Sequence, residues 1–313
     1  MEITSRALRA KRSCASGFRW FARHFKSAAE YQHVIDALVD DGRAADACWL
    51  MDQFGPIDAV RVVDSISADA FVFAGTLEVR QGVDVGSLMR VGGSLRAGGS
   101  LRMGNSLTVG GDLHATTGIR ALGILKTGGN LVSAWSVEVH GALTCEGDLR
   151  IHGDLRCGAM LRVGGAAVVD AGLEVNGPVQ CAKSLRVGGA IVCTDSLRAA
   201  HGIQAGRSIR SGMHIDVGWG AVAGADIAAE GAIRAGECVV SGGDIRAGAG
   251  YGIYAGSSVR QDAWPSCGRV VSRTRPEGLL SGLWQDDAAS APQASSPGRP
   301  FEPAATALAE AAR

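Results

Sequence analysis

Large apolar residues recur at every sixth position through most of the chain. Stepping by six from Leu77 to Ile245 visits 29 positions, of which 27 are Leu, Ile, Val or Met and two are Ala. Two residues further on, from Val79 to Ala247, the same steps meet only Val, Ala, Cys, Ser, Met, Ile or Thr. A large apolar residue, an outward residue and a small residue form the period-2 pattern of a short strand with one buried face. The pattern therefore predicts a series of three-residue strands rather than helices.

Glycine marks the positions between these strands. The fourth position of the six-residue unit is Gly at 16 of 29 steps, which suits a corner that needs positive φ or close backbone approach. A strand of about three residues cannot bury its inner face alone and must stack coil on coil. Three units per coil would close a triangular prism with about 18 residues per coil. The predicted fold class is an all-β solenoid, namely a parallel β-helix of about ten coils.

The two ends of the chain lack this period. The segment 27–30 reads as a capping box ahead of a helical pattern, and a second helix from Arg43 should end at Gly55. Phe71 and Phe73 extend the inner positions backwards and can plug the first coil. The predicted segments are a basic aromatic segment 1–26, a helical hairpin 27–56, an N-terminal cap of the rod 57–76, the parallel β-helix 77–259, a C-terminal cap 260–284 and a disordered tail 285–313.

The overall charge is zero, with 31 Lys and Arg against 31 Asp and Glu. A neutral chain lacks the field that would steer it onto a polyanion, so nucleic acid is not expected as a partner. The sequence contains no run of 18 apolar residues and no apolar leader. We therefore expect a cytoplasmic protein, with peripheral membrane contact as a further option.

Eight cysteines raise the question of disulfides or zinc. Cys145 and Cys181 lie 36 residues apart, as do Cys157 and Cys193, so each pair would share a column of the rod but skip a coil. The resulting separation of about 9.6 Å exceeds the reach of a disulfide, and no C-x-x-C pair is present. We expect buried thiols, no metal site and no cofactor.

One face of the predicted rod carries a regular row of cations. A basic side chain recurs there in every second coil, about 9.6 Å along the axis. The cations of this basic ladder are Arg90, Lys126, Arg162, Arg198 and Arg234. The ladder would fit an elongated anionic partner, whereas the simpler interpretation is solubility, with neighbouring Asp residues as counter-charges.

The first 27 residues hold seven Lys and Arg and one acid. Three phenylalanines fall on one helical face with a tryptophan beside it, and three cations lie elsewhere around the same helix. The residues of this candidate surface are Phe18, Arg19, Trp20, Phe21, Arg23, Phe25 and Lys26. Such a segment can lie on an anionic membrane surface or bind a protein partner. Equally, its aromatic side chains can pack on the following hairpin or on the end of the rod.

Seven histidines could include a general base. Acyltransferases of the hexapeptide type share the six-residue period, and they use a histidine beside a loop that projects from the helix. The unbroken register from 77 to 250 leaves no such loop and only flat faces, which lack the concave pocket that small-molecule chemistry usually needs. We therefore assign no catalytic residue and do not expect a small-molecule substrate.

The Ser-Leu-Arg-Val-Gly-Gly units between Leu77 and Ile245 resemble the β-helical core of the bactofilins, the polymer-forming bacterial cytoskeletal proteins. The resemblance covers a little over half of the chain. It implies a bacterial, nucleotide-free scaffold that assembles end to end and recruits other proteins, often at the membrane. The chain departs from the bactofilin pattern in its longer rod, in the helical hairpin before it and in the tryptophan-bearing segment after it.

These observations together favour a non-enzymatic scaffold or protein-interaction module that self-assembles or is recruited to a surface. One alternative is a hexapeptide-repeat acyltransferase. Another is a bacterial effector, or its binding partner, in which the rod holds two ends apart.

Overall fold

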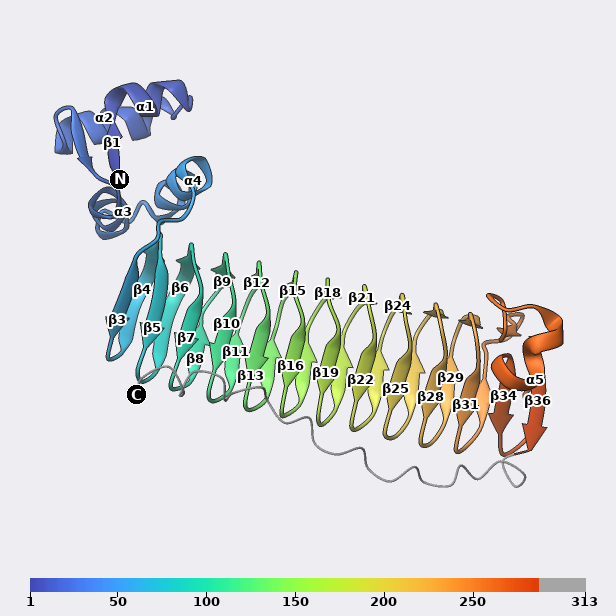
Figure 1. Cartoon of the computed structure of the whole chain (residues 1–313). Coiled ribbons are helices and arrows are strands. Elements are labelled where there is room, and N and C mark those ends of the chain that lie inside the picture. Colours follow the sequence, from blue (N-terminus) through green and yellow to red (C-terminus); the bar gives the residue numbers. More distant parts are fainter. Residues whose placement is uncertain (287–313) are drawn as a thin grey trace, which may run out of the picture.

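A computed structural model of the chain describes residues 1–286, and it consists of a long rod with a small helical domain at its N-terminal end (Figure 1). The rod is a parallel β-helix whose strands pair with strands 18 residues away, as Leu113 pairs with Leu131. The predicted fold class and coil length are therefore confirmed. The tail expected at 285–313 lies outside the described residues, except that Gln285 and Asp286 belong to the last strand, β36 (Leu283–Asp286).

Each coil contributes strands to three faces, which we number in chain order. The first face is a 13-stranded parallel sheet. Its strands are β3 (Val60–Val63), β5 (Thr76–Val79), β7 (Leu95–Ala97), β10 (Leu113–Ala115), β13 (Leu131–Ser133), β16 (Leu149–Ile151), β19 (Ala167–Val169), β22 (Leu185–Val187), β25 (Ile203–Ala205), β28 (Ala221–Ala223), β31 (Val239–Ser241), β34 (Arg269–Ser272) and β36.

The second and third faces form one 21-stranded sheet, because β6 (Val83–Val91) spans both: it pairs with β4 (Ile66–Phe73) on one side and with one strand of each face on the other. The second face continues with β8 (Leu101–Met103), β11 (Ile119–Ala121), β14 (Val137–Val139), β17 (Leu155–Cys157), β20 (Leu173–Val175), β23 (Ile191–Cys193), β26 (Ile209–Ser211), β29 (Ile227–Ala229) and β32 (Ile245–Arg246). The third face continues with β9 (Ser106–Val109), β12 (Leu125–Thr127), β15 (Leu143–Cys145), β18 (Leu161–Val163), β21 (Val179–Cys181), β24 (Leu197–Ala199), β27 (Ile215–Val217), β30 (Ile233–Ala235), β33 (Ile253–Tyr254) and β35 (Leu279–Ser281).

The six-residue series forms the core of the rod. None of its 29 side chains from Leu77 to Ile245 is more than 2% exposed. The companion series two residues on is also buried, apart from the half-buried Ala247. Phe73 belongs to the same core and Phe71 packs against it. Because burial of one such large apolar side chain is worth roughly 1.5–3 kcal/mol, the unbroken column stabilises the rod along its whole length.

The coils extend beyond both predicted limits. Residues 57–76, expected as a cap, contain β3 and all of β4, which pair in parallel with β5 and β6. Residues 260–284, also expected as a cap, include β34 and β35, which continue the sheets. The irregular part of this segment includes a 3-10 turn (Gln261–Ala263), the short helix α5 (Trp264–Cys267) and the loop 273–278.

Close backbone approach explains why glycine recurs at the corners. A Cβ atom added to Gly110 would lie 2.1 Å from the carbonyl oxygen of Gly92 in the preceding coil. Gly104 would place a Cβ even closer to Gly86. These glycines have no positive φ, so of the two reasons considered for them, only the steric one applies.

Polar side chains next to the glycines of one corner bridge successive coils. Asp112 Oδ1 accepts a hydrogen bond from the N–H of Asn130 (2.7 Å), and Asn130 Oδ1 accepts one from the N–H of Asp148 (2.8 Å). Asp148 Oδ1 then accepts from the N–H of Ala166 (2.7 Å). Such side chains satisfy backbone donors that a turn would otherwise expose.

The helical domain precedes the rod. Its elements are β1 (Glu2–Thr4), α1 (Ser5–Ala10), α2 (Ala15–His24), β2 (Ala28–Glu30), α3 (Tyr31–Asp40) and α4 (Ala44–Phe54). The predicted hairpin corresponds to α3 and α4, but α3 begins later than the capping box indicated. Glu30, not Ser27, caps it by accepting from the N–H groups of Gln32 and His33. Residues 28–30 are extended because they pair antiparallel with β1.

Replacing the buried Leu149 by Asp should prevent the rod from folding. The change places an unpaired charge in a closed apolar column, which costs several kcal/mol. The matched control is Arg150→Asp, because Arg150 is the next residue and is exposed. Circular dichroism should show a cooperative thermal transition for the control and none for Leu149→Asp. A native-like transition in Leu149→Asp would disprove the assignment of the inner column.

A second pair of variants tests the corner glycines. Gly110→Ala should lower the melting temperature, because the new Cβ meets the Gly92 carbonyl oxygen at 2.1 Å. Gly82→Ala should leave it nearly unchanged, since the nearest atom there is 3.4 Å away. We expect Gly110→Ala to cost about 1–3 kcal/mol, as overpacking does elsewhere. Equal melting temperatures for the two variants would refute the steric explanation.

Candidate functional site

The helical domain has an apolar core of its own. Trp20 and Phe21 of α2 are 7% and 2% exposed, and they pack with Val34, Ile35 and Leu38 of α3. Trp20 also donates from its indole Nε1 to Asp41. The aromatic face of the first segment therefore packs on the following hairpin, which is one of the two alternatives that the sequence left open.

Several polar contacts join this domain to the first coils of the rod. The side-chain amide of Gln32, 7% exposed, donates to the carbonyl oxygen of Val72 (3.1 Å) and accepts from the N–H of Ala74 (2.9 Å). Arg90 forms an ion pair with Asp52 of α4 and donates to the carbonyl oxygen of Cys48 (3.3 Å). Val72 and Ala74 also belong to the core of the domain. The domain is thus packed directly on β4.

The cations of the first segment lie on the outside of this domain. Its two half-buried aromatic residues, Phe18 and Phe25, border the core, and the Arg9 guanidinium lies 4.8 Å from the Phe18 ring. The exposed cations are Arg6, Arg9, Lys11, Arg12, Arg19, Arg23 and Lys26. Within the described part of the chain none of them forms an ion pair, and we call them the basic surface. No helix in residues 1–286 has the length and apolar character needed to cross a bilayer.

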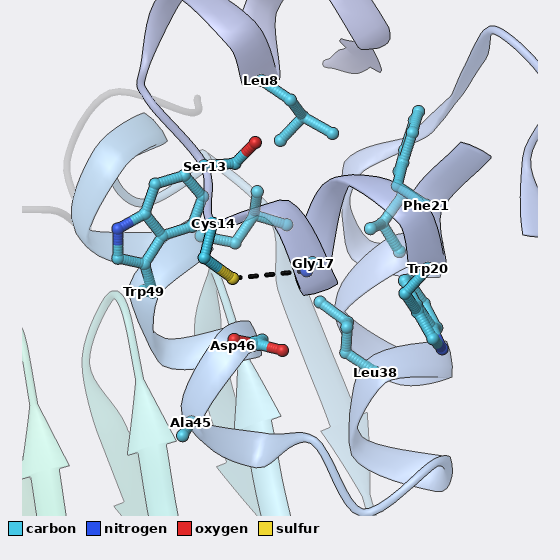
Figure 2. Close-up of a pocket in the computed structure, with 12 residues that line it drawn as sticks. Leu8, Ser13, Cys14, Gly17, Trp20, Phe21, Leu38, Ala45, Asp46 and Trp49 are labelled. Carbon is cyan, nitrogen blue, oxygen red and sulfur yellow. Dashed lines mark hydrogen bonds between the residues drawn. The ribbon is translucent and has the colours of Figure 1, made fainter. Parts of the chain in front are cut away.

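A cavity opens between the helices of the domain (Figure 2). Cys14 lies in its wall and caps α2, because its Sγ accepts from the N–H of Gly17 (3.2 Å). The hydroxyl of Ser16 and that N–H group together hold the pKa of the Cys14 thiol below its ordinary value. Asp46 also lines the cavity and forms an ion pair with Arg43.

The predicted basic ladder does form one column, on the third face of the rod. Its residues alternate along paired strands, as Lys126 beside Thr108 and Thr144 shows. Asp216, which lies in the same column, forms ion pairs with Arg198 (3.3 Å) and Arg234 (3.1 Å). Arg90, described above, is engaged by the helical domain. In the part of the chain that the structure describes, only Lys126 and Arg162 of the ladder lack an ion pair.

A shallow groove follows this column in its C-terminal half. Its residues include Glu146, Arg162, Gln180 and Asp216. Acidic side chains therefore stand among the cations, as the simpler interpretation of the ladder proposed. The groove offers an alternating surface rather than a positive strip.

Histidines of the rod form pairs with acids on its surface, whereas the inner cysteines belong to its core. His140 contacts Glu138 (3.1 Å) and His152 contacts Asp170 (2.7 Å), all on the outside of the rod. All eight cysteines are free, and the four inner ones are buried. Burial raises the pKa of each inner thiol. Residues 1–286 contain no group of three His, Cys, Asp or Glu side chains placed to hold a metal ion.

The sequence indicated the cations Arg19, Arg23 and Lys26 but not the cavity of the helical domain. Cys14 could have been noticed, because it stands one residue before Ala15-Ser16-Gly17, where a helix begins. The cavity itself had no signal in the sequence, since it depends on how four short helices pack.

The comparisons with known proteins bear on the helical domain alone. The family model of the YdhT N-terminal domain matches residues 1–54. This range ends at the last residue of α4, so the matched segment coincides with the helical domain. No curated protein matches the chain significantly. No solved structure does so either.

Proposed function

We propose that the protein is a non-enzymatic scaffold whose rod holds the helical domain against an anionic surface. The observation that carries the proposal is the basic surface, which presents seven exposed cations without ion pairs among residues 1–286. Unpaired cations on one domain attract an anionic membrane by about 1 kcal/mol each near the surface. Many cations of the rod are instead paired with acids, as Arg156 is with Glu174 and Arg198 with Asp216.

The regular structure of the rod fits the role of a spacer. Its strands follow one another at six-residue steps from β7 to β31, and no loop projects between them. Each coil is bonded to the next on three faces, so bending would require many hydrogen bonds to open together. A stiff rod keeps whatever binds at one end at a fixed distance from the other.

End-to-end assembly is the second element of the proposal, in keeping with the resemblance to bactofilins. β3 and β36 are the two edge strands of the first face. Val60 and Val62 are exposed on β3, and Leu283 is exposed on β36. Exposed apolar edge strands are templates for pairing with another chain, so the C-terminal end of one copy would add to the N-terminal end of the next.

Charge reversal on the basic surface tests the membrane contact. The triple variant Arg19→Glu, Arg23→Glu, Lys26→Glu should reduce co-sedimentation with phosphatidylglycerol vesicles by on the order of 100-fold, since three cations supply about 3 kcal/mol. The matched control changes three exposed cations of the rod, Lys126, Arg150 and Arg186, to Glu. Binding of the wild type should also weaken at high salt. If wild-type protein stays in the supernatant at low salt, the contact does not exist.

Size-exclusion chromatography and negative-stain microscopy test the assembly. We expect the wild type to form end-to-end multimers and Val62→Lys to elute as a monomer, because Lys on an edge strand opposes pairing. Val222→Lys is the control, since Val222 is exposed on the same face but lies on β28, an inner strand that is paired on both sides. A wild type that is monomeric at every concentration would eliminate this element.

A further inference from the structure

The cavity of the helical domain is not used by the contacts proposed above. It lies between α1, α2, α3 and α4 and has a volume of about 210 Å³. Figure 2 shows its walls, which include Leu8, Phe21, Leu38 and Trp49. Engineered apolar cavities of about 150 Å³ bind benzene. The space is therefore large enough for an apolar group of several carbon atoms.

Two cations directly precede residues of the cavity wall in the chain. Ser13 and Cys14 line the cavity, and the two residues immediately before them are Lys11 and Arg12. Both cations are exposed and neither forms an ion pair within residues 1–286. An apolar cavity beside unpaired positive charge matches a molecule that carries an aliphatic chain and an acidic head group.

The shape of the cavity indicates that its ligand is an aliphatic chain rather than a helix of a partner protein. The walls come from four helices and the loop between α1 and α2, so the cavity is a hole among helices and not a groove along one of them. An amphipathic partner helix would need a groove with several apolar anchors.

The rest of the domain surface supports the same choice. Within residues 1–54, Met1 is the one large apolar residue whose side chain is exposed. Protein interfaces have an apolar core, and membrane-inserting helices need a broad apolar face. The domain offers neither, whereas a single chain entering the cavity needs no exposed apolar surface.

We propose that this cavity binds the aliphatic chain of an anionic amphiphile, with its acidic head group beside Lys11 and Arg12. A membrane lipid and a free fatty acid share this chemistry. The inference deepens the proposed membrane contact and rests on the same domain, because it explains how a domain without an apolar face could hold a lipid.

The thiol of Cys14 gives a direct readout. Decanoate in the cavity should slow alkylation of Cys14 by iodoacetamide about tenfold, because reaction needs an accessible thiolate. Mass spectrometry reports each cysteine separately, and the exposed Cys267 is the internal control. Decyltrimethylammonium, which has the same chain and a cationic head, should give no protection. Equal protection by both amphiphiles, or none by decanoate, would overturn the proposal.

A cavity-filling variant locates the protection. Ala45 lines the cavity and is exposed, so Ala45→Trp should fill its mouth without disturbing the core. Ala22→Trp is the matched control, because Ala22 is exposed on α2 and does not line the cavity. With decanoate, Cys14 should be protected in Ala22→Trp and not in Ala45→Trp, both variants showing the wild-type thermal transition. Undiminished protection in Ala45→Trp would place decanoate elsewhere and refute the site.

Vesicles separate this inference from the proposed function. Phosphatidylglycerol vesicles should protect Cys14 in the wild type if the chain comes from a membrane lipid, whereas protection by decanoate alone assigns a free fatty acid. Vesicle binding without protection of Cys14 by either probe leaves the membrane contact standing and refutes the cavity. Protection of Cys14 by decanoate without vesicle binding supports the cavity and refutes the membrane contact. Protection by an acidic leucine-containing peptide, and not by decanoate, would assign a protein ligand and also refute the inference.

Discussion

The hydrogen bonds between successive coils constrain everything else in the rod. Between Leu77 and Ile245 each coil pairs with residues 18 positions away on all three faces, so a residue inserted into a strand there would shift the faces of the next coil. The inner column must then stay apolar at every sixth position, because a one-residue slip would turn the buried side chains outward. The same close stacking leaves no room for a Cβ beside the carbonyl group of Gly92. The hexad sequence is the consequence of this geometry.

The same constraint explains why the rod has flat, repetitive faces, whereas the helical domain has a cavity and unpaired cations. Side chains on the flat faces meet equivalent positions of the next coil, so opposite charges pair along a column, as Arg120 with Glu138 and Arg156 with Glu174 do. The helical domain is free of this repetition. Its short helices pack irregularly, and this irregular packing leaves both a cavity and a set of cations without counter-ions among the described residues.

The periodic part of the chain could be predicted from sequence because its structure depends on local spacing. The inner positions, the coil length and the buried cysteines all follow from the six-residue step. The N-terminal domain could not be predicted in the same way. The apolar stripe of Phe18, Phe21 and Phe25 looks alike whether it packs on its own chain or on a partner, and the start of α3 depends on pairing between β1 and β2. That pairing joins residues 24 to 28 positions apart, which no local pattern records.

The amide of Gln32 makes the two ends of the rod unequal. Its donor and acceptor occupy the backbone groups of Val72 and Ala74, which a preceding coil would otherwise use. The helical domain thus stands in for one strand of a missing coil on the third face, while β3 on the first face has no such substitute in the described residues. In a head-to-tail assembly every junction would join β36 of one copy to this partly occupied end of the next, so the helical domain would stand at each junction. Such an assembly would be polar, with a free β36 edge at one end and a helical domain at the other.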